Sequence, residues 1–271
     1  MPPISACIIA KNQAQRIRLA LDSLTWCHSI VVVDSGSTDA TIEICKSHPG
    51  PAGRGVKIVQ EPFRGYNPQR QFAASLCPTD WVLLLDADEE VSDKLREEIL
   101  GLTDQRLATA AIFQMPRKNY IAKRYVRCWS PDCQTRLVHK NRTVWAAQSA
   151  PEIRTPKYGF ATRNLRHPLL HNRLTPFSPK DFCDGPRMEE HARILADAMQ
   201  ARGKRATLLE LLTRPGLTFL KYYLLKGAFL DGRFGLTIAL KSTIGATLKY
   251  SVLYGRELPN EPKPTDNPPA S

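Results

Sequence analysis

The stretch Asp80–Glu89, DWVLLLDADE, joins an unbroken apolar run to a cluster of acidic residues. A strand that is apolar on both faces is typical of a parallel sheet covered by helices on both sides. The ligands of such sheets bind beyond the carboxyl ends of the strands. The stretch therefore predicts an α/β fold in which Asp86 and Asp88 stand at the edge of the sheet where a ligand binds.

The residues before this stretch repeat the order of strand, polar tip and helix. Ile4–Ala10 and Ile30–Val33 predict strands that end in the polar residues Lys11 and Asn12 and in Asp34–Ser37. Three polar tips at one edge of a parallel sheet predict a binding site there. The other elements expected in this part are a strand over Val56–Gln60 and helices over Gln13–Leu24, Thr41–Ser47, Pro68–Leu76 and from the capping residue Ser92 to Leu100.

Composition divides the rest of the chain. Residues 108–170 are rich in Arg, Tyr and Trp and interrupted by prolines, which predicts mixed strands and loops that complete the sheet. Helical patterns return from Ser178, over 188–201, 207–230 and 235–254, and the polar, Pro-rich end predicts a disordered tail. We therefore expect a sheet domain over residues 1–177, with halves at 1–105 and 106–177, a helical region over 178–256 and a tail over 257–271.

The chain of 271 residues is strongly basic, since 38 Lys and Arg against 26 Asp and Glu give a formal charge of +12. This charge favours phosphorylated substrates, anionic lipid or nucleic acid without choosing among them. The seven cysteines form no C-x-x-C pair, which predicts free thiols in a reducing compartment. Because the sequence shows neither a secretory signal nor a long apolar run, we expect a cytoplasmic protein, or one peripheral at the inner face of the plasma membrane.

The acidic cluster has the spacing of a metal site. Alternate side chains of an extended segment point the same way, so Asp86 and Asp88 can present carboxylates to one ion. Mg²⁺ and Mn²⁺ take oxygen ligands and share their coordination shell with substrate phosphates. The alternative is an acidic loop that stabilises the start of the helix after Ser92.

A second polar cluster, Val33–Asp39, follows the strand at Ile30–Val33. Gly36 permits a tight turn, and the carboxylate of Asp34 can accept hydrogen bonds from a nucleobase or ribose. For Ser37, Thr38 and Asp39 the simpler interpretation is that they cap the next helix.

Three segments, Ser5–Asn12, Val32–Thr41 and Asp80–Glu89, together resemble glycosyltransferase family 2, the inverting enzymes with a GT-A fold. A fuller pattern, which includes Gly65, Gln69–Phe72, Gly227–Gly232 and Leu248–Tyr250, is similar to bacterial lipopolysaccharide core β-1,4-glucosyltransferase-like proteins.

This resemblance implies a metal-dependent hexosyltransferase that uses Mg²⁺ or Mn²⁺ and a nucleotide sugar such as UDP-glucose. Its acceptor would be a glycan or a lipid-linked glycan of the lipopolysaccharide core. Residues 1–105 would form the nucleotide-sugar half and 106–177 the acceptor half. Ser35 stands where many relatives carry a second Asp, which leaves the nucleoside contact less well defined. The implied nucleotide-sugar site contains Ala10, Asn12, Asp34, Gly65, Arg70 and Asp86, and the implied metal ligands are Asp86 and Asp88.

An inverting enzyme needs a carboxylate that takes the proton of the acceptor hydroxyl. Glu152 is the first candidate, because relatives commonly place a His-Glu pair in this region, although Pro151 stands here where that His would be. Asp132 is the second candidate, and either residue could instead be an ordinary surface carboxylate. His139, His167 and His171 have no ligand spacing and are interpreted as structural.

Basic residues gather in two further places. Arg70, Arg136 and the stretch from Arg117 to Arg127 could bind phosphate groups or simply form a solvated basic face. Between Arg202 and Arg256 basic residues alternate with Leu, Phe, Tyr and Ile, a composition typical of amphipathic helices on anionic membranes. The alternative is that the apolar stripe packs on the sheet domain or on another subunit.

Three other functions agree with parts of the sequence. A nucleic-acid-binding protein fits the charge, but no recognition motif is present, so no nucleic-acid partner is expected. A phosphohydrolase with Asp86 as nucleophile is expected to carry a Thr or Val soon after the second Asp, where this chain has Glu89 and Glu90. A non-catalytic nucleotide-sugar binder or a nucleotidyltransferase would keep the same fold.

Overall fold

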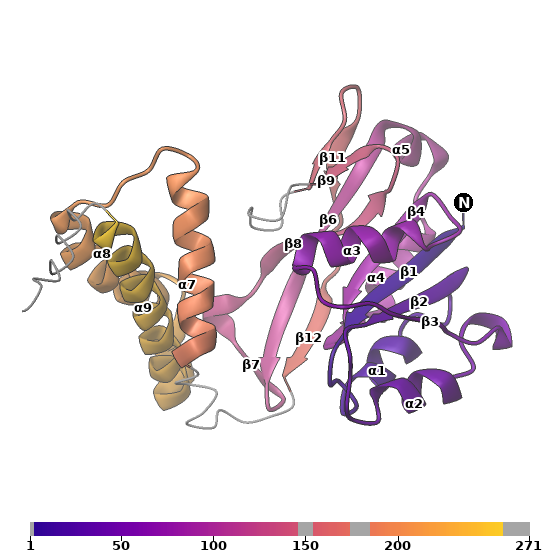
Figure 1. The fold of residues 1–271 in the computed structure, drawn as a ribbon, viewed down its shortest axis with the longest axis horizontal. Coiled ribbons are helices and arrows are strands. Elements are labelled where there is room, and N and C mark those ends of the chain that lie inside the picture. Colours follow the sequence, from indigo (N-terminus) through magenta and orange to yellow (C-terminus); the bar gives the residue numbers. More distant parts are fainter. Residues whose placement is uncertain (1–2, 146–153, 174–184, 257–271) are drawn as a thin grey trace, which may run out of the picture.

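The structure, a computed structural model, describes residues 3–145, 154–173 and 185–256. Its centre is a ten-stranded mixed sheet (Figure 1) in the order β3-β2-β1-β4-β8-β6-β12-β5, with β7 and β11 paired to β6. The strands are β1 (Ile4–Ala10), β2 (Ser29–Asp34), β3 (Lys57–Gln60), β4 (Trp81–Asp86), β5 (Glu89–Val91), β6 (Ala110–Ile121), β7 (Arg124–Tyr125), β8 (Asp132–His139), β11 (Ala161–Asn164) and β12 (Leu169–Arg173), and β9 (Thr143–Trp145) pairs with β10 (Arg154–Pro156) outside this sheet.

The first four strands of the sequence form the parallel part of the sheet, and Ala6 of β1 lies between Ile30 of β2 and Leu83 of β4. Beyond β4 the sheet becomes mixed, because β8 runs antiparallel to both β4 and β6. Strand β12 runs parallel to β6 and antiparallel to β5. This last pairing brings a strand from the second half of the domain next to the acidic cluster that follows β4.

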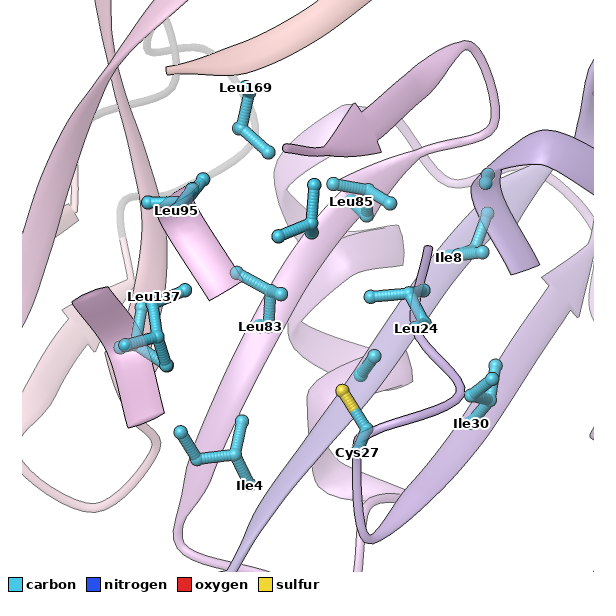
Figure 2. Packing of buried hydrophobic residues seen from close by; sticks show 14 of the residues in the cluster. Ile4, Ile8, Leu24, Cys27, Ile30, Leu83, Leu85, Leu95, Leu137 and Leu169 are labelled. Atoms are coloured by element: carbon cyan, nitrogen blue, oxygen red, sulfur yellow. The ribbon is translucent and has the colours of Figure 1, made fainter. Parts of the chain in front are cut away.

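Helices cover both faces of the parallel part. On one face Ile8 packs with residues of α1 (Ile17–Asp22), α2 (Thr41–Ser47) and α4 (Asp93–Leu100), and Figure 2 shows part of this cluster. On the other face Cys7, the neighbour of Ile8, packs against α3 (Tyr66–Ser75). Adjacent residues of one strand thus enter two different cores, and the predicted GT-A architecture is confirmed. The short helix α5 (Asp104–Thr109) and the 3-10 turns η1 (Pro51–Gly53) and η2 (Arg127–Trp129) complete this part.

The first helix is shorter than the sequence predicts. Its pattern covers Gln13–Leu24, but α1 begins only at Ile17. The backbone N–H groups of Gln13 and Ala14 donate to the side chains of Thr41 and Asp39, at 2.7 and 3.0 Å. The chain after β1 is therefore held as a loop by hydrogen bonds to the polar tip of β2.

The C-terminal part consists of α7 (Gly185–Gln200), α8 (Leu208–Leu220) and α9 (Gly232–Gly255), which stand together beside β6, β7 and β8 (Figure 1). Here the predicted helix 207–230 is broken, because α8 ends in the π-turn η3 (Lys221–Leu225), Gly227 adopts a φ of 71°, and η4 (Ala228–Asp231) leads into α9. A Cβ at Gly235 would lie 1.8 Å from the carbonyl oxygen of Ala228, so glycine permits this close packing. Among the described residues, no helix combines the length and apolar character needed to cross a membrane.

Candidate functional site

A cleft of about 910 Å³ opens at the carboxyl edge of β1, β2 and β4. The loop after β1 and the turn after β4 supply much of its lining. Among the residues predicted for the site, Ala10, Asn12, Asp86 and Asp88 line this cleft. The other lining residues include Lys11, Arg16, Ser35, Asp39, Phe63, Tyr66, Ile121 and His171.

The loops after β1 and β2 hold each other in place. Asn12 has a φ of 53°, and its side-chain oxygen accepts a hydrogen bond from the backbone N–H of Thr38 at 2.8 Å. In return, the backbone N–H of Asn12 donates to the hydroxyl of Ser37 at 2.8 Å. These contacts fix the backbone around Ala10–Asn12, which forms one wall of the cleft.

Asp34 lies behind this wall. It is fully buried, and its carboxylate accepts hydrogen bonds from the backbone N–H groups of Gly36 and Ser37 at 3.0 and 2.9 Å and from the Ser37 hydroxyl. Asp34 therefore shapes the turn that carries Ser35 into the cleft, while its direct contact with a nucleoside stays a prediction.

Asp86 lies between two buried arginines. Its oxygens each accept a hydrogen bond at 2.6 Å, one from Arg70 of α3 and one from Arg136 of β8. Burial would raise the pKa of Asp86, but the guanidinium groups of Arg136 and Arg70 outweigh it and hold that pKa far below the usual range. With both oxygens paired to arginine, Asp86 is an ionised anchor, and its predicted role as a metal ligand stays a prediction.

Glu89 continues this buried ion-pair cluster. It is fully buried, and one of its oxygens lies 2.6 Å from Arg136 and 2.8 Å from Arg117 of β6. Its other oxygen accepts a hydrogen bond from the backbone N–H of Asp86 at 3.2 Å. A buried charge requires a charged and hydrogen-bonded partner, so Glu89 stays bound to its two arginines. The cluster thereby fixes the turn Asp86–Glu89 on the side that faces the protein interior.

Asp88 faces the cleft with a different set of partners. Its carboxylate lies 3.1 Å from Nε2 of His171 on β12 and 3.5 Å from Arg16 before α1. Burial raises the pKa of Asp88, but the hydrogen bond and charge of His171 lower it more, so the net shift is downward. Asp88 and His171 are thus a carboxylate and an imidazole presented together to the cleft.

A polar chain links this pair to Asp132. Nδ1 of His171 lies 2.7 Å from the side-chain oxygen of Asn119, whose amide nitrogen donates to Asp132 at 3.0 Å. Arg117 also donates to both Asp132 oxygens, at 3.3 and 2.8 Å. The register of the strands explains this series of hydrogen-bonded side chains. His171 pairs with Asn119 between β12 and β6, and Arg117 pairs with Asp132 between β6 and β8.

Of the two candidate bases, the structure describes Asp132 but not Glu152. Asp132 is partly exposed and begins β8; burial raises its pKa, and Arg117 and its other hydrogen-bond donors lower it below the usual value. It is therefore ionised at neutral pH, as a proton acceptor must be. Glu152, the first candidate from the sequence, lies outside the described residues.

The donor set at Asp88 fits a divalent cation that is completed by substrate. Among the described residues, no group of three His, Cys, Asp or Glu side chains is close enough to hold an ion alone. Asp88 and His171 would offer such an ion one oxygen and one nitrogen ligand. Mg²⁺ and Mn²⁺ are commonly held by one or two protein ligands together with substrate phosphates, and imidazole is acceptable to transition metals.

The remaining predicted donor residues support the rim of the cleft. Gly65 has a φ of 97°, and its carbonyl accepts the hydrogen bond of Gln69 that starts α3. The flanking side chains of Phe63 and Tyr66 are about half exposed and form an edge-to-face pair, with ring centroids 5.2 Å apart. Arg70, which binds Asp86, also lies 5.7 Å from the Tyr66 ring. An exposed aromatic pair beside a cleft is suited to contact the flat face of a base.

Sequence reasoning assigned no site role to Arg16, Phe63, Tyr66, Asn119 and His171. Arg16 falls inside the region predicted as helix. Asn119 lies between Arg117 and Arg127, where the sequence pattern indicated only a group of basic residues. His171 is separated from Asp88 by 83 residues. No local spacing could join two residues so far apart, since it is the pairing of β12 with β5 and β6 that does so.

A polar cleft with an acidic turn at the carboxyl edge of the parallel strands agrees with the class of enzymes that the resemblance implied. The model of the family described as glycosyl transferase family 2 matches residues 5–174, and the chain belongs to this family. The protein is therefore a glycosyltransferase, as the resemblance predicted.

Among curated proteins, the chain is 28% identical to the lipopolysaccharide core biosynthesis glycosyltransferase LpsC of Rhizobium meliloti, over 94% of this chain and 93% of that protein. A shorter match is 45% identical to an uncharacterized glycosyltransferase of Rickettsia felis, over 36% of this chain and 33% of that protein. Among solved structures, a mannosyltransferase of Pyrobaculum calidifontis in complex with GDP-Man and Mn²⁺ has a TM-score of 0.54 at 16% identity, with 92% of this chain and 87% of that chain covered. This last likeness supports the fold.

Proposed function

We propose that this protein transfers a hexose from a nucleotide sugar, such as UDP-glucose, to a glycan acceptor during synthesis of the lipopolysaccharide core. The observation that carries the proposal is the Asp88–His171 pair, which stands at the open cleft beside the carboxyl ends of the parallel strands. Similarity to LpsC along nearly the whole chain supports the choice of acceptor.

The cleft offers positive charge where the diphosphate of a donor would lie. Lys11 and Arg16 line it, and Arg16 lies next to Asp88. A divalent cation held by Asp88 and His171 would stabilise the negative charge that develops on the diphosphate as it leaves. The rings of Phe63 and Tyr66 at the rim would contact the nucleobase.

Asp132, which unlike Glu152 is among the described residues, is the carboxylate that we propose as the proton acceptor; it does not line the cleft itself but reaches it through Asn119 and His171. In a single displacement, the acceptor oxygen bonds to the anomeric carbon while the bond from that carbon to the diphosphate oxygen breaks. The hydroxyl proton then passes to a carboxylate within hydrogen-bond reach. Asp132 is connected through Asn119 to His171, so the proposed proton acceptor and the donor site share one hydrogen-bond network.

A nucleotide-release assay tests this function. The purified chain would be incubated with UDP-glucose, other UDP-sugars and GDP-mannose, with Mn²⁺, Mg²⁺ or EDTA, and with truncated lipopolysaccharide core as acceptor. We expect release of the nucleoside diphosphate that depends on both acceptor and metal, together with a mass increase of one hexose on the acceptor. A separate incubation with UTP and glucose 1-phosphate that released pyrophosphate would indicate a nucleotidyltransferase, and donor binding without turnover would indicate a sugar-nucleotide binder; either result would overturn the proposal.

A further inference from the structure

The connection between α8 and α9 exposes a compact group of large apolar side chains. The exposed fractions of Leu224, Leu225, Phe229 and Leu230 are 52%, 85%, 47% and 62%, and we call these four residues the apolar tip. They lie within seven consecutive residues, held by the π-turn η3 and by Gly227. Exposed apolar groups of this kind mark an interaction surface, because their burial would be favourable and the fold does not bury them.

Basic side chains surround the apolar tip. Lys221, Lys226 and Arg233 are exposed on the helical side. Residues 221–236 contain one acidic residue, Asp231, which lies 3.6 Å from Arg127 and so is already paired. The field beside the apolar tip is therefore positive.

The hairpin of β6 and β7 extends this positive surface from the sheet domain. Lys123, Arg124 and Arg127 are exposed there, and residues 121–129 contain no acidic residue. Arg124 lies 4.8 Å from the ring of Phe234 at the start of α9, which joins the hairpin to the helical side. The two segments thus contribute six exposed basic residues against one acidic residue, Asp231, and the contacts of Arg124 with Phe234 and of Arg127 with Asp231 join them.

We propose that the apolar tip and its basic surroundings dock the protein on an anionic lipid bilayer. Leucine and phenylalanine side chains would enter the boundary between headgroups and acyl chains, while Lys and Arg contact the anionic headgroups. A second copy of the chain is disfavoured as the occupant, since it would place one positive surface against another. Charge complementarity instead matches an anionic membrane.

A buried cluster of side chains connects the segment that carries the docking surface to the cleft. Ile121 lines the cleft, and it is buried in the same cluster as Ala228 of η4 and Ile238 of α9. A membrane bound at the apolar tip would therefore lie close to the cleft. This position suits a lipid-anchored acceptor, an extension that rests on the proposed function, whereas the docking surface itself does not.

Vesicle flotation of the full-length chain tests the docking surface. Vesicles of phosphatidylcholine alone would be compared with vesicles of phosphatidylcholine and phosphatidylglycerol, without nucleotide sugar. We expect binding to the anionic vesicles that weakens as salt is added. Leu225→Glu should reduce this binding by about tenfold or more. The substitution replaces an apolar side chain that would enter the lipid with a charge that anionic lipid repels.

Matched variants separate docking from a general effect of charge. Leu100→Glu makes the same change at an exposed leucine of α4 and should leave vesicle binding unchanged. The pair Lys221→Ala and Arg233→Ala should weaken binding several-fold, and Lys94→Ala with Arg163→Ala, which removes the same charge from exposed sites elsewhere, should affect it less.

Three results would overturn the docking surface. The first is equal binding to neutral and anionic vesicles, and the second is an equal effect of Leu225→Glu and Leu100→Glu on vesicle binding. The third is a wild-type protein that does not bind vesicles and forms a dimer in light scattering, which Leu225→Glu dissociates. Failure of the glycosyl transfer assay with vesicle binding intact would instead contradict the proposed function alone.

Discussion

Nε2 of His171 lies 3.1 Å from a carboxylate oxygen of Asp88, although the two residues are 83 positions apart in the sequence. Both ring nitrogens of His171 face oxygen atoms, since Nδ1 lies 2.7 Å from the side-chain oxygen of Asn119. When Nδ1 carries the proton and donates to Asn119, Nε2 is left with the lone pair that a cation held by Asp88 would need. The metal site expected from Asp86 and Asp88 stays a prediction, and His171 is a further candidate ligand beside Asp88.

Replacement of His171 should weaken metal binding. We expect His171→Ala to lower the affinity for Mn²⁺, measured by calorimetry in the presence of UDP, at least about tenfold, since even the loss of a group that orients a ligand has this effect. His167→Ala is the matched control, because His167 pairs with Glu98 away from the cleft. Equal Mn²⁺ affinity in the two variants would argue against a ligand role for His171.

Asp88→Ala should abolish metal-dependent UDP binding. The side chain is partly exposed and its ion pairs are near the surface, so the free energy of unfolding should stay within about 1 kcal/mol of wild type. Titration with UDP and Mn²⁺ and urea unfolding measure the two quantities. Asp93→Ala, at an exposed carboxylate of α4, should change neither. If Asp88→Ala binds UDP in the presence of Mn²⁺ with the affinity of the wild type, Asp88 is not a metal ligand.

Asp132→Asn should lower kcat by about 10²–10⁴-fold while UDP binding is retained, because loss of a general base affects the transfer step. Rates of acceptor-dependent nucleotide release measure this effect. The control is Glu190→Gln, at an exposed carboxylate of α7, which should leave the rate unchanged. A normal rate in Asp132→Asn would transfer the role to another carboxylate, with Glu152 as the next to test.

Arg136→Leu should destabilise the fold by about 3–5 kcal/mol, because it leaves the buried carboxylate of Glu89 with one arginine fewer and weakens the hold on Asp86. Denaturant unfolding measures the change. Arg163→Leu, at an exposed site of β11, should stay within about 0.5 kcal/mol. A loss below about 1 kcal/mol in Arg136→Leu would show that the cluster contributes little net stability.

The lowered pKa of Asp86 gives the fold a predicted acid sensitivity. A carboxyl whose pKa is depressed in the folded state contributes stability above its unfolded pKa of about 3.9, and this contribution is lost as pH falls below that value. Wild type should therefore lose stability more steeply than Asp86→Asn below about pH 4, with little difference in slope at neutral pH. Unfolding curves at a series of pH values measure the two slopes, and parallel slopes would contradict the assignment.

The sequence by itself determined the parallel half of the sheet and the edge at which the cleft lies. Apolar runs such as Trp81–Leu85 become buried strands because both of their faces must be covered, and the polar residue after each run marks the strand end. Asn12, Asp86 and Asp88 could therefore be assigned to one edge of the sheet from local pattern, and they line the cleft together with Ala10, which the family resemblance implied. These features depend on residues that are close together along the chain.

Only the tertiary structure decided which partner each charged side chain has. Asp86 was expected to bind metal, yet its oxygens bind Arg70 and Arg136, which reach it from α3 and β8. His171 and Asn119 enter the site because β12 pairs with β6 and β5. Such pairings are long-range, and their register follows from the packing of the whole sheet rather than from a local pattern. The sequence therefore located the cleft, while the sheet register determined the chemistry that its residues can perform.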